Sequence, residues 1–397
     1  MRAVRPRRTR FPGSLRVVFL AVLVLELALG AGQAPARETT VGATSFRRPP
    51  VASAVPGALP AGFRYRYAEA RRGWPVRPEA VQHPIRGSFL DPRGADNDGL
   101  AGYHFGVDIN VDDNAPEPGA PPGMSHRVFA LESGVVSFPV NDATRTCGNR
   151  RLDAGHFSYW HVSPIVPAST RVRAGQQIGW TCVGEWHVHV SEWQAWQGTR
   201  VWVNPLHRGG KLVPYTSTLA PLVTGLRFHT PPSRPWRPVP ELSAPDSSKQ
   251  VPAGALRGLV ELRASVVVPQ SFLDFLARNP RWPTGHHPYR VAAEVRSLRS
   301  GAVVLRRTAF QSDQLPLTPY LVHFAPGTRQ NDSMGECLAA PSTQPCQGEY
   351  WFRPFSRYRQ EFWNTRRVPN GPYRVTVTAW SLTGNRGKAS IDVTVAN

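Results

Sequence analysis

Cysteine is scarce in this sequence, with four in 397 residues. No two of them have the close spacing of about two to four residues that is typical of paired zinc ligands, which argues against a structural zinc site held by thiolates. Four cysteines in an exported chain favour two disulfides, and they allow three pairings. Because Cys337 and Cys346 bracket a proline-containing loop, we expect them to pair, and Cys147 to pair with Cys182.

Long apolar runs are also lacking, apart from one near the start of the chain. A cluster of arginines precedes Val17–Leu29, which Glu26 interrupts and which is too short for the roughly 20 residues of a membrane span. Small residues follow as far as Ala34. This order is typical of a secretory signal, which we place at 1–34; an uncleaved anchor is the alternative. We therefore expect a secreted, periplasmic or cell-wall-associated protein.

Acidic residues are few, because 27 Asp and Glu stand against 47 Lys and Arg, for a net charge of +20. In an exported protein such charge suits peptidoglycan or another anionic cell-wall polymer as partner. The arginines are scattered and no nucleic-acid-binding motif is present, so nucleic acid is not an expected partner. No other stretch is apolar enough to predict a stable membrane span.

The remaining chain divides by composition. Residues 35–81 are rich in Pro, Ala and Arg and are predicted to be a linker or a wrapping arm. Short alternating segments between Gly, Pro and Asp predict a compact β domain over 82–208. A proline-rich connector is expected over 209–253 and a β-sandwich over 254–397, where apolar residues alternate with polar ones. The predicted fold class is mostly β, with antiparallel sheets.

Two histidine motifs fall within the predicted β domain. In an extended stretch YHFGVDIN, His104 and Asp108 point to one face, and Gly106 between them leaves space. In WHVHV, alternation places His187 and His189 on one face and the apolar residues on the other. Two such strands side by side would bring imidazoles and a carboxylate together.

A third stretch, HFSYWH, could bring His161 to the same pocket. Three ligands from histidine and carboxylate, with a fourth position open, are typical of a catalytic zinc site. The ligand types alone do not exclude iron or manganese. Each motif by itself is more often structural than functional, but their combination in this order favours a metal site.

Taken in order, these motifs resemble those of the lysostaphin-type, LytM-like zinc metallopeptidases, which cleave peptide bonds in peptidoglycan. HFGVD at 104–108 matches the His-x-Gly-x-Asp signature, and HVHVSEW at 187–193 resembles His-Leu-His-Phe-Glu. YWHVSP, AGQQIGW and VNPLHR also resemble elements of that family. The resemblance covers about 125 residues and implies a duplicated hybrid motif fold. In its C-terminal region, NGPYRVTVTAWSLTGNRG resembles bacterial immunoglobulin-like modules, for which a spacer role is expected rather than wall binding.

The resemblance implies a role for each residue. His104, Asp108 and His189 would be the zinc ligands, and His161 and His187 the paired catalytic histidines, with no indication of which is the base. The sequence departs from the family where Glu185 and Trp186 replace a Gly-Pro pair beside the expected substrate groove, so substrate preference is expected to differ. Glu185 and Glu192 are each either a hydrogen-bond partner that orients an imidazole or a charge exposed to solvent.

Three functions are compatible with these motifs. The first is an exported zinc metalloendopeptidase acting on peptidoglycan through a metal-activated water. The second is a catalytically silent cell-wall binding or regulatory protein that retains the metallopeptidase scaffold, and the third is an exported protease acting on proteins. Because no ligand position is missing, we expect the first.

Overall fold

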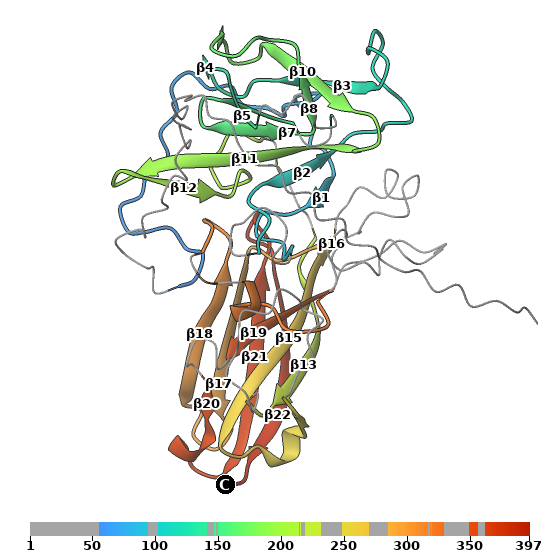
Figure 1. Ribbon diagram of the computed structural model, residues 1–397. Helices are drawn as coiled ribbons and strands as arrows, with labels where there is room; N and C mark the ends of the chain where they lie inside the picture. Colours follow the sequence, from blue (N-terminus) through green and yellow to red (C-terminus); the bar gives the residue numbers. More distant parts are fainter. Residues whose placement is uncertain are drawn as a thin grey trace, which may run out of the picture. The chain divides into compact units, whose positions relative to one another are not determined.

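The computed structural model is mostly β, and its paired strands run antiparallel (Figure 1). The residues it describes are 55–93, 102–140, 150–213, 219–231, 248–269, 285–316, 320–328, 349–355 and 362–397, with Cys147, Tyr215 and Thr318. The predicted fold class is therefore confirmed. Within these residues no helix has the length and apolar character needed to cross a membrane. The predicted signal at 1–34 lies outside the described residues.

The first part of the described chain is built on a seven-stranded sheet of order β1-β2-β11-β7-β6-β5, with β12 paired to β11. Its strands are β1 (Ile85–Gly87), β2 (Val107–Asn110), β5 (Ser137–Val140), β6 (Arg151–Ala154), β7 (Phe157–Trp160), β11 (His187–Trp196) and β12 (Thr199–Val203). Two small sheets accompany it: β3 (Met124–Phe129), β10 (Gln177–Cys182) and β8 (Val162–Pro164), and β4 (Gly134–Val135) with β9 (Arg171–Val172).

The second part consists of two antiparallel sheets whose buried faces share one hydrophobic core. One sheet contains β13 (Leu222–His229), β14 (Gln250–Val251), β15 (Leu259–Pro269), β16 (Gly285–His286), β19 (Tyr350–Phe355) and β20 (Trp363–Asn364). The other contains β17 (Arg290–Ser297), β18 (Val303–Gln311), β21 (Gly371–Trp380) and β22 (Arg386–Val395). The alternation predicted for β21 is present, because Tyr373, Val375, Val377 and Ala379 are all buried.

Two segments differ from, or refine, the expected organisation. The stretch 209–253 was expected to be a connector, but β13 lies within it and pairs with β15 from Leu222↔Val267 to His229↔Glu261. Its prolines flank this strand and do not interrupt it, so pairing is possible. Upstream, the segment 55–81 begins at the second part, where the Gly57 carbonyl oxygen accepts the N–H groups of Asp313 and Gln314. It then runs along the first part as an arm and buries Trp74 completely.

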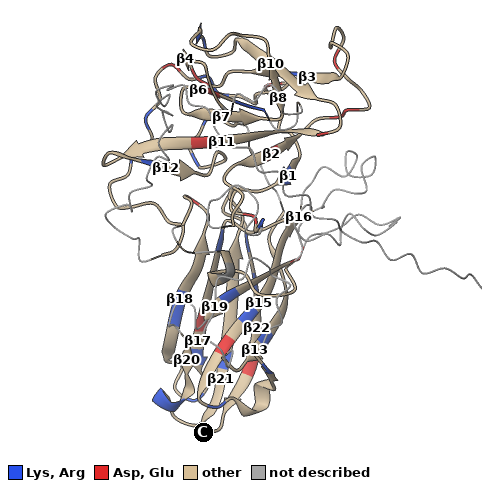
Figure 2. Ribbon diagram, viewed as in Figure 1, with Lys and Arg blue, Asp and Glu red and all other residues tan. Residues whose placement is uncertain are grey.

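Direct backbone contacts join the two parts, and Phe46–Asn397 forms one compact unit. Asn204, just after β12, donates its backbone N–H to the Asp313 carbonyl oxygen at 2.9 Å and its side-chain amide to the Ser312 carbonyl oxygen at 2.8 Å. Lys and Arg are spread over many strands and are not gathered on one (Figure 2). Scattered charge of this kind gives no single basic stripe.

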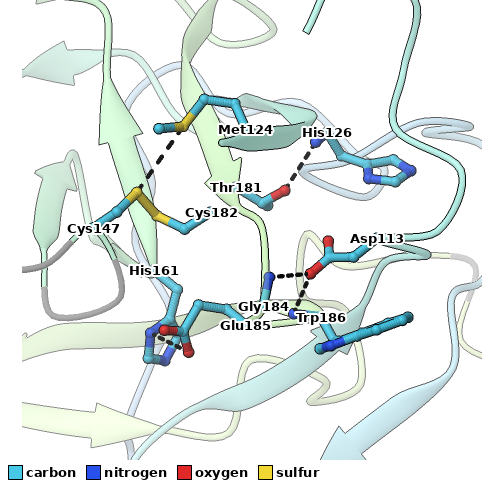
Figure 3. The surroundings of a disulfide bond; sticks show 10 residues. All are labelled: Asp113, Met124, His126, Cys147, His161, Thr181, Cys182, Gly184, Glu185 and Trp186. Carbon is cyan, nitrogen blue, oxygen red and sulfur yellow. Dashed lines mark hydrogen bonds and ion pairs between the residues drawn. A yellow bond between two sulfur atoms is a disulfide. The ribbon is translucent and has the colours of Figure 1, made fainter. Parts of the chain in front are cut away.

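The disulfide predicted between Cys147 and Cys182 is present (Figure 3). It connects the segment before β6 to the last residue of β10, across a sequence separation of 35. Among the described residues no cysteine is free. The predicted pair of Cys337 and Cys346 lies outside the described residues.

Candidate metal centre

Asp108 and His189 lie directly opposite each other on neighbouring strands. Asp108 belongs to β2 and His189 to β11, and the antiparallel register pairs them, so both side chains project from the same face of the sheet. The adjacent pair, Val107 and Val190, is fully buried on the other face. The alternation predicted for WHVHV is therefore what places His189 at the site.

His104 reaches the same place from outside the strand. β2 begins only at Val107, so the expectation that His104 and Asp108 share one extended strand is wrong. The loop after β1 holds His104 instead: its N–H donates to the Asp91 carbonyl oxygen at 2.8 Å, and its carbonyl accepts the Leu90 N–H at 2.7 Å. Gly106 is required here, since a Cβ would lie 2.5 Å from His189 Nε2.

Three donor atoms converge in this buried space. His104 Nε2 is 2.7 Å from His189 Nδ1, and Asp108 Oδ1 is 3.0 Å from each of these two nitrogens. Tetrahedral bonds of about 2.0–2.1 Å would place neighbouring donors about 3.3 Å apart, close to these separations. Within the described residues, this is the one group of His, Cys, Asp and Glu that could hold a metal ion.

Each ring has a hydrogen-bonding partner on its outer side. His104 Nδ1 donates to the Ser88 carbonyl oxygen at 2.9 Å, so in the neutral ring Nε2 is the unprotonated nitrogen. His189 Nε2 lies 2.7 Å from Ser191 Oγ, a hydroxyl that can accept from it when Nδ1 binds a metal. In that tautomer two lone pairs and a carboxylate oxygen face one another, an arrangement that a cation stabilises. The residues fit a metal ion.

The protonation states of the cluster suit metal binding. Burial by itself raises the pKa of Asp108, but the imidazoles of His104 and His187 and its hydrogen bonds hold that pKa well below its ordinary value. Arg93 Nη2 also donates to Asp108 Oδ2 at 2.8 Å. Burial lowers the pKa of His104 although Asp108 opposes the shift. An ionised carboxylate and neutral imidazoles are the forms in which these residues ligate metals.

His161 and His187 lie beside the three-residue cluster as a pair, with their ring centroids 4.4 Å apart. His187 is the first residue of β11, and its Nε2 is 3.6 Å from Asp108 Oδ1. His161 follows β7 with a φ of 63°, and its ring centroid is 6.5 Å from that of His189. All five sequence-predicted site residues are therefore brought together.

The paired histidines have different neighbours. Arg86 Nη1, from β1, is 3.0 Å from His187 Nδ1, and Glu185 Oε2 is 3.4 Å from His161 Nδ1. Burial holds the pKa of His187 well below its ordinary value, and the charge of Arg86 acts in the same direction. His187 thus has a cation, Arg86, as a neighbour, and His161 has an anion, Glu185.

Sequence reasoning missed the residues that orient the ligands. Ser191 shares a face with His189 two positions along β11, so alternation alone could have suggested it. Ser88, Arg86 and Arg93 carry no recognisable motif, and only the fold brings them to the cluster. Glu192 was expected either to orient an imidazole or to be a solvated charge. It is fully buried on the other face of β11, where the Tyr67 hydroxyl donates to it at 2.6 Å.

Two tryptophans near the end of β11, Trp193 and Trp196, take different positions. Trp193 is partly buried with the Arg200 guanidinium 4.1 Å above its ring, and Trp196 packs against Phe63 of the arm.

Comparison with known proteins gives no relative, since neither a family model nor a curated protein matches the chain. What the cluster does is therefore inferred from its geometry and from the motif resemblance.

Proposed function

We propose that this protein is an exported zinc metalloendopeptidase that hydrolyses peptide bonds in bacterial peptidoglycan. The observation that carries the proposal is the convergence of His104, Asp108 and His189, each oriented by a further hydrogen bond, beside the pair of His161 and His187. Three ligands with a neighbouring pair of proton-transfer groups are what metal-assisted hydrolysis requires.

Zinc is the ion that this donor set suits best. Two imidazole nitrogens and one carboxylate oxygen form a common catalytic zinc site, and three protein ligands leave a position for water or substrate. Bound zinc polarises a carbonyl and lowers the pKa of water towards about 7. Iron and manganese accept similar ligands, so metal analysis of the purified protein is needed to identify the ion.

The paired histidines supply what the ligands cannot. One imidazole takes a proton from the attacking water, and the other donates a hydrogen bond to the carbonyl oxygen as negative charge develops on it. His161 and His187 are placed for such a division, because both lie next to the cluster without belonging to its three donors.

The choice of peptidoglycan rests on two supports. One is the ordered resemblance of HFGVD, YWHVSP and HVHVSEW to enzymes of the lysostaphin type. The other is the net charge of +20, which favours approach to anionic wall polymers. Glu185 and Trp186 stand where those enzymes have Gly-Pro, so the preferred peptide is expected to differ from theirs.

The test is to incubate the zinc-loaded mature chain with purified peptidoglycan and to identify new amino termini by mass spectrometry. We expect defined new termini, none with His189→Ala, and normal release with His126→Ala, which changes a histidine that belongs neither to the cluster nor to the pair. If the unmutated, zinc-loaded chain releases nothing but sediments with peptidoglycan, the peptidase proposal is overturned in favour of a wall-binding protein.

A further inference from the structure

The turn between β10 and β11, residues 182–186, is held unusually firmly for a connection that carries no regular structure. The disulfide to Cys147 fixes its first residue, and the Glu185 N–H donates to the Cys182 carbonyl oxygen at 3.2 Å. Asp113 Oδ2 accepts the N–H groups of Gly184 at 2.8 Å and Trp186 at 3.0 Å (Figure 3). The position of Glu185 is therefore set from both sides.

The same turn also holds the backbone of His161. The Cys182 N–H donates to the His161 carbonyl oxygen at 3.2 Å, and the His161 N–H donates to the Arg150 carbonyl oxygen at 3.1 Å. These two bonds secure His161 in its left-handed conformation, which costs a non-glycine residue free energy that its surroundings must offset. His161 and Glu185 are thus both held in place through Cys182, by its backbone hydrogen bonds and its disulfide.

The Glu185 carboxylate meets one particular ring nitrogen of His161. Oε2 lies 3.4 Å from His161 Nδ1, and Figure 3 shows the two side chains directed towards each other. A carboxylate has only acceptors, so the hydrogen bond requires a proton on Nδ1. The nitrogen on the far side of the ring, Nε2, then carries the lone pair.

His187 has mixed partners. Arg86 Nη1 lies 3.0 Å from both His187 Nδ1 and the Glu185 carbonyl oxygen, and that carbonyl also contacts His187 Nδ1. A guanidinium only donates and a carbonyl oxygen only accepts, so these two contacts at Nδ1 favour opposite tautomers of His187. The other ring nitrogen, Nε2, is 3.6 Å from Asp108 Oδ1.

We infer that Glu185 is a positioning residue that holds Nδ1 of His161 and so presents Nε2 as the proton acceptor of the site. This inference rests on the proposed function. His161 Nε2 takes a proton from the attacking water as the water oxygen bonds to the carbonyl carbon. The same proton passes to the amide nitrogen as the carbon–nitrogen bond breaks, so His161 ends unchanged. The role left to His187 is a hydrogen bond to the carbonyl oxygen.

The residue that carries this assignment is one in which the chain departs from the lysostaphin-type pattern. A Gly-Pro pair offers no carboxylate to an imidazole, whereas Glu185 does. The carboxylate of Glu185 therefore distinguishes His161 from the other histidine of the pair.

The test is to record ring-nitrogen NMR spectra of the full chain with ¹⁵N-histidine, in zinc-loaded and metal-free forms, at a pH at which His161 is neutral. We expect His161 to carry its proton on Nδ1. In Glu185→Ala the proton should move to Nε2, which free imidazole favours in water. Glu185→Gln should keep it on Nδ1, because the amide oxygen still accepts. His187 should keep the tautomer of the unmutated chain in both variants, since neither alters the Glu185 backbone carbonyl or Arg86.

Turnover and zinc content complete the test. Glu185→Ala should lose about 10- to 100-fold in turnover, the usual scale for a partner that orients a site residue, while retaining full zinc. Glu185→Gln should recover most of that loss. Glu79→Ala is the matched control, because Glu79 is similarly exposed and pairs with Arg71 away from the site.

Two results overturn the inference: a proton on Nε2 of His161 in the unmutated chain, or a tautomer that Glu185→Ala does not change. If the tautomers behave as expected but no form of the protein cleaves peptidoglycan, the positioning by Glu185 is supported and the proposed peptidase activity is not. The two proposals can therefore fail separately.

Discussion

Strand β11 carries buried polar groups on both faces, and the two faces differ in how those groups are matched. On one face, His189 Nδ1 lies 2.7 Å from His104 Nε2 and 3.0 Å from Asp108 Oδ1, so three possible ligand atoms meet. On the other face, Glu192 accepts from the Tyr67 hydroxyl at 2.6 Å and from the Gln194 amide at 3.1 Å. Both faces contain carboxylate and histidine.

The difference between the two faces of β11 shows what distinguishes a metal site from a buried polar network. His207 Nε2 lies 2.9 Å from the Tyr67 hydroxyl and 3.4 Å from Glu192 Oε1, so the second face also brings a histidine near a carboxylate. There, Tyr67 and Gln194 donate to Glu192 Oε1, Oε2 has no hydrogen-bond partner among the described residues, and the network joins the arm to the sheet. Burial of His and Glu together is thus insufficient, and the feature that marks the metal face is the convergence of one ligand atom from each of three residues.

The largest expected difference between the faces is in zinc content. Replacing any of His104, Asp108 or His189 by Ala removes one of three ligands, and we expect each variant to lose most of its zinc and all turnover. His207→Ala, on the other face, should keep about one zinc per chain. Metal analysis of the purified variants decides this, and full zinc in all three ligand variants would exclude the cluster as the metal site.

A smaller loss is expected from the paired histidines, which lie on the metal face without being ligands. His187→Ala and His161→Ala should retain zinc but lose about 100-fold or more in turnover, because a proton acceptor or an oxyanion donor is removed. Zinc content and rate are measured on the same preparation. Loss of zinc from His187→Ala would make His187 a ligand and contradict this division of roles.

The next largest effect is expected on zinc affinity, when the hydrogen bond on the outer side of a ligand ring is removed. Ser191→Ala removes the hydroxyl 2.7 Å from His189 Nε2, and we expect zinc affinity to fall about 10- to 100-fold because the ring loses its orientation. Competition with a chelator measures the affinity. Ser158→Ala, which changes the serine paired with Ser191 on β7, is the control. Equal affinities in both variants and the unmutated chain would assign Ser191 no part in metal binding.

The smallest effect on the metal is expected from the other face. Tyr67→Phe leaves Glu192 without its shortest donor, which should lower the free energy of unfolding by about 1–3 kcal/mol. Zinc content and turnover should be unchanged. Denaturant titration and metal analysis check the two halves of this prediction. A zinc-depleted Tyr67→Phe variant would show that the faces are coupled and not independent.

The sequence predicted the site better than its surroundings. Alternation in WHVHV was sufficient to put His187 and His189 on one face, because period-two geometry is local. It could not show that His104 sits in a loop fixed by Asp91 and Leu90, nor that Tyr67 satisfies Glu192 from 125 positions away. Such contacts depend on which strands become neighbours.

The same limit explains the boundary of the sandwich. Proline-rich sequence on both sides of β13 favoured a connector, yet the strand itself contains no proline and pairs along its length with β15. Composition averaged over 209–253 obscured eight residues of regular structure. The disulfide of Cys147 with Cys182 was predictable because only a few pairings exist, whereas the bracing of His161 by that turn was not.

The pairing of β2 with β11 has a consequence for folding errors. Val188 faces Ile109 and Val190 faces Val107 in the same register that sets His189 opposite Asp108. A slip of β11 by one residue would turn Val188 and Val190 out of the core and turn His189 away from the site. Burial of the two valines therefore favours the same register that brings the two ligands together.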